Sequence, residues 1–215
     1  LRPKEYICYD YNQPVLSENL WFAEGITSYF DMFLPYLSNN SCEEDLYTDL
    51  SSLVTRYLST PGRFYQSLSD SSREAWVKLY KAKPYSIDSQ ISYYNVGAVT
   101  SLCLDILLRE RNHSLSSLLR YLYNDPRILE QGYQRNDIID YLDKIDPFLS
   151  NELHKFLDVP GYINIQEYLT KVGLLINHSY SNKLSHGIHI DQSSPSIEII
   201  RLERDCDAKN AGLAI

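Results

Sequence analysis

The stretch from Ile91 to Arg109 reads ISYYNVGAVTSLCLDILLR and contains the most continuous apolar run in the chain, SLCLDILL. Its apolar residues recur at helical spacing, and a helix that is apolar around most of its circumference is usually buried. The sequence therefore predicts a central helix from about Ile91 to Arg111, around which the other elements pack.

Helical spacing of apolar residues continues from residue 17 to near residue 174, which predicts a mainly α fold. Ser17 is expected to cap a helix that runs to about residue 37. Ser41 and Glu44 have the spacing of a capping box, which predicts the start of a second helix. Further helices are expected at residues 70–80, 115–123, 136–144, 147–157 and 165–171.

Composition and charge argue against several kinds of partner. The 215 residues are 44% hydrophobic, which is enough for one sizeable core or for one domain and part of a second. The formal net charge of −8 offers nothing to hold a phosphate backbone, so we expect no nucleic-acid partner. No apolar run approaches the roughly 20 residues that span a bilayer, so no membrane partner is expected either.

The four cysteines are spread singly, without a CxxC pair or a histidine at metal-ligand spacing. We interpret them as reduced thiols, which favours a reducing compartment such as the cytoplasm. They are Cys8, Cys42, Cys103 and Cys206.

We expect both ends of the chain to be cuts in a longer protein. Residues 1–12, LRPKEYICYDYN, lack an initiator Met and the charged-then-apolar layout of a signal peptide. The final residues, DAKNAGLAI, begin a Gly-Leu turn that no closing element follows.

Glu24 is the residue that most directly suggests chemistry, because it is the one carboxylate in the apolar stretch LWFAEGITSYF, Leu20 to Phe30. A buried carboxylate without a partner costs several kcal/mol, so it normally lies beside a cation, and zinc would serve. Gly25 costs a helix roughly 1 kcal/mol relative to Ala, which indicates that something packs tightly against the backbone there. The alternative is a solvated glutamate on one face of an amphipathic helix.

Several segments in a fixed order resemble the glycyl aminopeptidase family of zinc metallopeptidases. The resemblance covers roughly residues 1–175, and its strength lies in the order of the segments, since no single one is specific. The segments are LRP from Leu1, LWFAEGITSYFD from Leu20, TPGRFYQSLSDSSREAWVKLY from Thr60, ISYYNVGAVTSLCLDILLR from Ile91, SLSSLLRYLY from Ser114 and GYQRNDIIDYL from Gly132.

This resemblance implies the helical C-terminal half of a thermolysin-like catalytic domain over residues 1–175. Glu24 matches the glutamate that completes a His₂Glu zinc site with water in the fourth position. Tyr94 matches the tyrosine of a YxKG-like motif that donates a hydrogen bond to the oxyanion, although Val96 stands where that motif commonly carries Lys. The alternative is that Tyr93 and Tyr94 are packing aromatics.

The chain lacks the rest of such a zinc site. Its five histidines include no HxxxH pair, and the strand-like spacing of His186 and His189 would point them to opposite faces. The HExxH helix is expected before Leu1, so this fragment should be inactive alone and should bind zinc weakly or not at all. Asp105 has Arg109 four residues on, which predicts a structural ion pair.

Residues 176–215 differ in character from the helical part. INHSYSNKLSHG is polar and loop-like, and GIHID and SIEIIRLE alternate as short strands do. HGIHIDQSSPSIEIIRLERDCDAKNAGL resembles the opening of a PDZ-like domain, which members of the family often carry. The resemblance implies a partial module with little or no peptide binding.

By the resemblance, the parent protein would release N-terminal residues from peptide or protein substrates, with glycine or another small residue favoured. Two other functions stay open. One is a helical scaffold that kept the peptidase shape without its catalysis. The other is an adaptor that binds peptides through the PDZ-like part.

Overall fold

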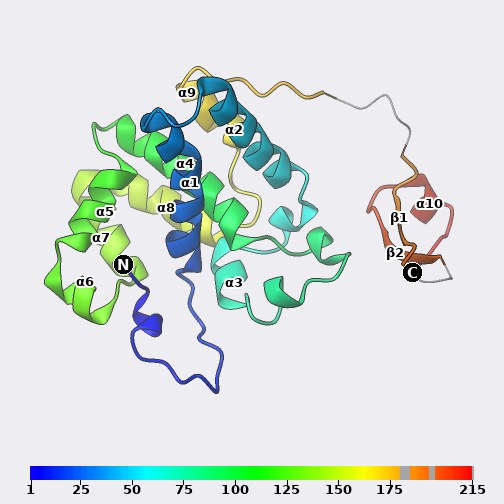
Figure 1. The fold of residues 1–215 in the computed structure, drawn as a ribbon, viewed down its shortest axis with the longest axis horizontal. Coiled ribbons are helices and arrows are strands. Elements are labelled where there is room, and N and C mark those ends of the chain that lie inside the picture. Colours follow the sequence, from blue (N-terminus) through cyan, green and yellow to red (C-terminus); the bar gives the residue numbers. More distant parts are fainter. Residues whose placement is uncertain (180–184, 194–196, 215) are drawn as a thin grey trace.

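The computed structural model describes residues 1–179, 185–193 and 197–214, and most of them are helical (Figure 1). The predicted mainly α fold with a short β segment is confirmed. The elements are η1 (Lys4–Tyr6), η2 (Trp21–Gly25), α1 (Ile26–Leu37), α2 (Glu43–Leu58), η3 (Pro61–Phe64), α3 (Leu68–Arg73), η4 (Leu79–Lys81), η5 (Ser86–Asp88), α4 (Tyr93–Arg109), α5 (Leu115–Tyr123), α6 (Pro126–Gln131), α7 (Arg135–Ile145), α8 (Pro147–Asp158), α9 (Ile165–Lys171), β1 (Ile188–Asp191), β2 (Glu198–Leu202) and α10 (Asp207–Asn210).

Helix α4 forms the centre of the helical body, as the apolar run predicts. It contacts η2 and helices α1, α2, α3, α5, α8 and α9 (Figure 1). Val99, Leu104 and Leu108 have no exposed surface. The segment Ser86–Arg109 is long and apolar enough to cross a membrane by length and composition alone, but 89% of its most apolar window is buried inside the protein. The apolar character of this segment is therefore explained by its burial in the protein core.

Several helix boundaries differ from the predicted ones. Helix α2 begins one residue later than expected, because the Asp45 carboxylate accepts a 3.0 Å hydrogen bond from the Cys42 N–H and replaces the Ser41–Glu44 box. The helix predicted at residues 70–80 ends at Arg73 and continues as irregular turns up to η4. Helix α6 was not predicted, although Asp125 caps it with a 2.9 Å bond from the Arg127 N–H.

The two strands at the end of the chain pair with each other. β1 and β2 are antiparallel, with Ile188 opposite Leu202, and the register shifts between His189 and Ile190. Residues 174–179 lead toward this hairpin without regular structure. A boundary near residue 176 and a PDZ-like identity for the hairpin stay predictions.

An ion pair joins the hairpin to the helical body. The Arg201 guanidinium on β2 donates to both carboxylate oxygens of Asp88 on η5, at 3.1 and 2.7 Å. Both side chains are partly buried, at 13% and 23% exposure. The Arg204 guanidinium also donates to the Tyr65 hydroxyl and lies over the Tyr65 ring. These contacts fix one edge of the hairpin against the segment that contains η3 and η5.

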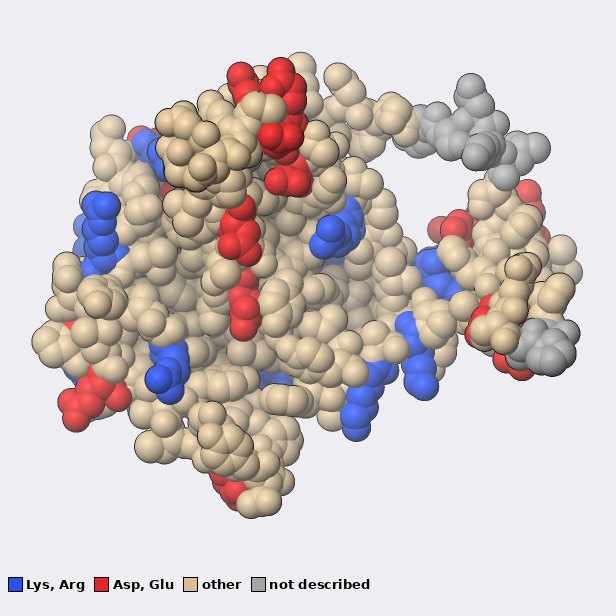
Figure 2. Space-filling model, viewed as in Figure 1, with Lys and Arg blue, Asp and Glu red and all other residues tan. Residues whose placement is uncertain are grey.

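Charged side chains are unevenly placed on the surface. On the face seen in Figure 2, acidic side chains gather over α1 and the start of α2, whereas basic side chains lie singly around them. The first turn of α2 supplies Glu43, Glu44 and Asp45. Acidic residues at a helix N-terminus interact favourably with the helix dipole, so this cluster stabilises α2 locally.

Candidate active site

The site is built where η2 crosses α4, and two glycines make the close crossing possible. A Cβ atom on Gly25 would lie 2.5 Å from the Cα and carbonyl carbon of Gly97. A Cβ atom on Gly97 would lie 2.9 Å from the Gly25 Cα and from the Trp21 carbonyl oxygen. The two backbones therefore touch directly. This confirms the prediction that something packs tightly against Gly25.

Glu24 belongs to the π-helical turn η2 rather than to a regular α-helix. Turns of this kind contain one extra residue per hydrogen-bonded ring and occur often at functional sites. Trp21 and Phe22 of the same turn are buried, and the Trp21 N–H donates a 3.1 Å bond to the Ser72 hydroxyl on α3. The turn is thus held from both sides, by α3 and by α4.

The Glu24 side chain is half-buried. Within the described residues 1–179, 185–193 and 197–214, no hydrogen-bond or ion-pair partner reaches its carboxylate. The carboxylate lies near the phenols of Tyr6, Tyr94 and Tyr133. Its negative charge is therefore one of the causes that raise the pKa of each phenol. Burial is the larger cause in all three.

The other buried acids of the fold do have donors. Asp105 on α4 accepts 2.7 Å bonds from the Arg109 guanidinium, the Tyr29 hydroxyl and the Leu115 N–H. The predicted Asp105–Arg109 ion pair is therefore confirmed, and the carboxylate also joins α1 and α5 to α4. The contrast sets Glu24 apart, since a partly buried carboxylate is normally compensated by a cation or by several donors.

Tyr94 lies one helical turn before Gly97 on α4 and is half-buried. Its ring stacks on that of Tyr93 at a centroid distance of 4.5 Å. The Tyr80 hydroxyl on η4 lies 2.9 Å from the Tyr93 hydroxyl and 3.5 Å from the Tyr94 hydroxyl. Burial first, and then the Tyr80 hydrogen bond, raise the pKa of Tyr94, so its phenol stays protonated at neutral pH.

Val96 does not share the surroundings of Tyr94. Two positions along an α-helix correspond to a rotation of about 200°. Val96 is buried and lines small hollows together with Ile91, Tyr57 and Leu79. Val96, which stands at the Lys position of the YxKG-like motif, therefore points to a different side of α4 from the Tyr94 phenol. The hydroxyls close to that of Tyr94 include those of Tyr80 and Tyr93.

Tyr6 and Tyr80 are site residues that the sequence did not reveal. Burial, followed by the charges of Tyr80, Glu5 and Glu24, raises the pKa of Tyr6, which places the N-terminal segment beside the site. Glu5 accepts a 2.9 Å bond from the Ser17 hydroxyl, which ties this segment to the chain just before η2. With 19 tyrosines in the chain, no local signal distinguishes these two.

The residues of the crossing could supply one of the four ligands of a zinc site. Among the residues that the structure describes, no three His, Cys, Asp or Glu side chains gather closely enough to hold a metal ion. Zinc takes four ligands from nitrogen, sulfur and oxygen donors. Glu24, as an uncompensated carboxylate at the surface of the crossing, offers one such oxygen donor.

The histidines have other contacts. The His186 Nδ1 accepts a 3.0 Å bond from the Ile188 N–H, while the His189 Nε2 lies 3.1 Å from the Glu203 carboxylate. The Arg135 guanidinium lies 2.8 Å from the His154 Nδ1. His186 and His189 therefore have separate partners, and His186 lies before β1 rather than in it.

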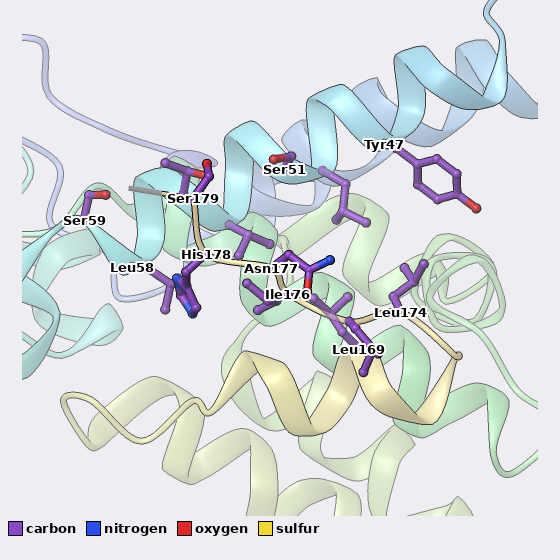
Figure 3. A pocket seen from close by; sticks show the side chains of 14 residues that line it. Tyr47, Ser51, Leu58, Ser59, Leu169, Leu174, Ile176, Asn177, His178 and Ser179 are labelled. Atoms are coloured by element: carbon purple, nitrogen blue, oxygen red, sulfur yellow. The ribbon is translucent and has the colours of Figure 1, made fainter. Parts of the chain in front are cut away.

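Two hollows of similar volume lie on the helical body, and one of them adjoins the Glu24 turn. A hollow of about 610 Å³ lies between α2, α9 and residues 174–179, and its lining combines aliphatic side chains with polar ones such as Ser51, Asn177 and His178 (Figure 3). It does not include Glu24 or Tyr94. Another hollow of about 600 Å³ lies on the outer side of η2 and α1, with Phe22, Ala23 and Tyr133 in its wall. Of the two, only the second adjoins the Glu24 turn.

Comparison with known proteins shows what this chain is similar to. Residues 1–100 match the sequence model of the M61 glycyl aminopeptidases. The crystal structure of an aminopeptidase N family protein from Idiomarina loihiensis is similar with a TM-score of 0.86 and 26% identity, over 100% of this chain and 40% of that chain. This chain thus spans 40% of the length of that relative. Among the curated proteins, none matches.

The matched residues 1–100 include Glu24, Tyr80 and Tyr94, and the structural match extends over the helices that follow. The resemblance seen in the sequence is confirmed by both comparisons. Over residues 1–100, this chain is similar to the M61 glycyl aminopeptidases.

Proposed function

We propose that this chain forms part of a zinc aminopeptidase, to which it contributes Glu24 as a metal ligand and Tyr94 as the oxyanion donor. The observation that carries the proposal is the Gly25–Gly97 crossing. It brings the half-buried Glu24 carboxylate, which has no cationic partner among the described residues, near the Tyr94 phenol, although the two residues are 70 positions apart in the sequence. The histidine ligands and the general base would come from an HExxH helix outside these 215 residues.

Each residue has a distinct task in peptide hydrolysis. A zinc ion, when bound, would polarise the scissile carbonyl and lower the pKa of its water. Glu24 would hold the ion through a carboxylate oxygen. Tyr94 would donate its proton in a hydrogen bond to the oxyanion that develops at the carbonyl. A phenol is protonated at neutral pH, and burial raises the pKa of Tyr94 further.

The substrates in this proposal are peptides or proteins with a free N-terminus. Glycine or another small residue at that end follows from the family alone. The PDZ-like hairpin, the cytoplasmic location and the absence of nucleic-acid and membrane partners belong to the proposal as well, on the grounds of sequence pattern and charge.

The test compares Glu24→Gln and Tyr94→Phe in the full-length protein that contains this chain. Glu24→Gln should lose most of the bound zinc, measured by metal analysis after dialysis, and with it the aminopeptidase turnover. Tyr94→Phe should keep the zinc and lower kcat by roughly 10², the scale of one lost oxyanion donor. Glu18→Gln is the matched control, because Glu18 is an exposed carboxylate in the same segment that pairs with Arg73.

The two variants test the two residue assignments separately. Unchanged zinc content in Glu24→Gln would remove the ligand assignment. Full activity in Tyr94→Phe would reassign that tyrosine to packing.

A further inference from the structure

Three aromatic side chains, those of Tyr6, Trp76 and Tyr80, form a partly exposed surface beside the candidate active site, which we call the aromatic wall. Trp76 and Tyr80 follow α3 in the chain and are 44% and 57% exposed, and their ring centroids lie 5.5 Å apart. Tyr6 of η1 is half-buried. A group of exposed large apolar side chains often marks an interaction site, whereas scattered single ones do not.

The aromatic wall is continuous with the residues proposed for catalysis. The Tyr80 hydroxyl lies 3.5 Å from that of Tyr94. Burial is the main cause that raises the pKa of Tyr6, and the charges of Tyr80 and Glu24 add to it. The Trp76 indole has the opposite effect on this pKa, so it also lies near the Tyr6 hydroxyl. Tyr6 is thus close both to the other two rings of the wall and to Glu24.

Backbone carbonyls hold the two exposed rings in place. The Trp76 indole N–H donates a 3.0 Å bond to the Val15 carbonyl. The Tyr80 N–H donates a 3.0 Å bond to the Ala75 carbonyl, which fixes the backbone that carries its ring. Rings that already have their position before a ligand arrives lose less conformational entropy when it binds.

We propose that the aromatic wall binds the side chain of the second residue of a peptide substrate, directly after the scissile bond, and favours a large apolar or aromatic side chain there. The inference rests on the proposed function, in which Tyr94 contacts the oxygen of the scissile carbonyl. An aminopeptidase cleaves after the first residue, so the second residue follows this carbonyl directly, with Cα atoms about 3.8 Å apart. Glycine or another small first residue has no side chain that covers two rings.

Apolar contact is the physical basis of the preference. The rings of Trp76 and Tyr80 are tilted by 41° to each other and expose part of their surface to water. An aromatic side chain of the substrate removes this apolar surface from water and makes ring contacts at the same time. An alanine side chain covers much less of it.

The test measures the preference of the full-length protein for the second residue. Two substrates with the same first residue, Gly-Phe-amide and Gly-Ala-amide, are compared by kcat/KM. The unmodified protein should favour Gly-Phe-amide by roughly tenfold, the scale of one aromatic side chain packed on another. Trp76→Ala should lower this ratio to about twofold or less, with zinc content and turnover of Gly-Ala-amide unchanged.

Two further variants make the test specific. Tyr85→Ala is the matched control and should leave the ratio unchanged, because Tyr85 is an exposed tyrosine in the same part of the chain but outside the wall. Trp76→Leu keeps an apolar side chain and should lower the ratio by roughly threefold. This variant decides the question if urea unfolding shows that Trp76→Ala does not fold.

The outcomes separate this inference from the proposed function. Equal kcat/KM for the two substrates in the unmodified protein, or an unchanged ratio in the folded Trp76 variants, would overturn it. A Trp76 variant that alters the choice between Gly-Ala-amide and Leu-Ala-amide would also overturn it, because the wall would then contact the first residue. Failure of the proposed function looks different: the unmodified protein would cleave neither substrate, and this inference would fall with it.

Discussion

Single carboxylates in this molecule differ in how their charge is compensated. Glu152 on α8 is buried and accepts 2.9 Å bonds from the Lys155 ammonium and the Tyr162 hydroxyl, together with a 3.2 Å bond from the Tyr168 hydroxyl. Burial alone would raise its pKa, but these donors outweigh burial and lower it below the ordinary value near 4.5. Glu24 has no such set of donors among the described residues.

The lowered pKa of Glu152 gives stability a defined pH dependence. A carboxyl whose pKa is lower in the folded state stabilises the protein above its unfolded pKa, and this contribution is lost as the pH falls through the folded value. Glu152→Gln should therefore lower the free energy of unfolding by about 2 kcal/mol at pH 7. The difference from the unmodified protein should shrink below about pH 4.5. Urea unfolding at several pH values measures it.

The exposed Glu167 on α9 serves as the control for this experiment, and Glu167→Gln should change stability little at any pH. The prediction would be contradicted if the difference in the free energy of unfolding between Glu152→Gln and the unmodified protein stayed constant from pH 7 to pH 3.

At the residue scale, sequence reasoning succeeded where the partner is local. Asp105 and Arg109 are four positions apart on one helix, so their pairing follows from helical geometry. The contacts of Tyr80 with Tyr93 and Tyr94 could not be predicted, because these side chains meet only through the tertiary fold. Glu24 and Tyr94 were identified as candidates by resemblance, and the glycine after Glu24 was the physical signal of a close crossing.

At the scale of elements, the crossing of η2 and α4 predicts that a Gly-to-Ala substitution in a helix destabilises the protein instead of stabilising it. Ala in place of Gly within a helix normally stabilises it by up to about 1 kcal/mol. Gly25→Ala should instead destabilise the protein by about 1–3 kcal/mol, because the new Cβ would meet the Gly97 backbone at 2.5 Å. Thermal and urea unfolding measure the change.

Ser28→Ala, on the same helical segment and half-buried, is the matched control and should leave stability nearly unchanged. If Gly25→Ala raised the melting temperature, the two backbones would not be in contact.

Helices with a clear apolar period were predictable as elements, and those shaped by tertiary contacts were not. The expected bounds of α5, residues 115–123, and of α9, residues 165–171, agree with the structure because the apolar period marks both helices, and Ser114 also caps α5. The helix expected at residues 70–80 stops at Arg73, and Trp76 in the turns beyond it bonds to Val15 far away in the sequence. The π-helical start of the first long helix depends on α4, which no local pattern contains.

For the molecule as a whole, the Asp88–Arg201 pair is one of the contacts that fix the hairpin to the helical body, beside that of Arg204 with Tyr65. Arg201→Glu should place two negative charges together and release the hairpin, because the pair is partly buried. Limited proteolysis in the segment before β1 should then be faster by roughly tenfold, which corresponds to about 1.4 kcal/mol. The reversed pair, Asp88→Arg with Arg201→Glu, should restore protection.

Lys209→Glu makes the same charge change at an exposed position on α10 and should not alter cleavage. Equal protection of Arg201→Glu and the unmodified protein would show that the hairpin is held by other contacts. The His189 imidazole lies 3.1 Å from both the Arg201 guanidinium and the Glu203 carboxylate, so Arg201→Glu also removes a neighbour of this histidine.

The wide turn from Trp21 to Gly25 has a consequence for how such a chain can vary. Removing one residue from it would leave an ordinary α-helical turn, and every side chain before the deletion would rotate by about 100° around the axis relative to α1. With the deletion at Ala23, for example, the buried Trp21 side chain would turn out of the core, even though Glu24 and Tyr94 would still be encoded. Segment length, as much as residue identity, is therefore under constraint here.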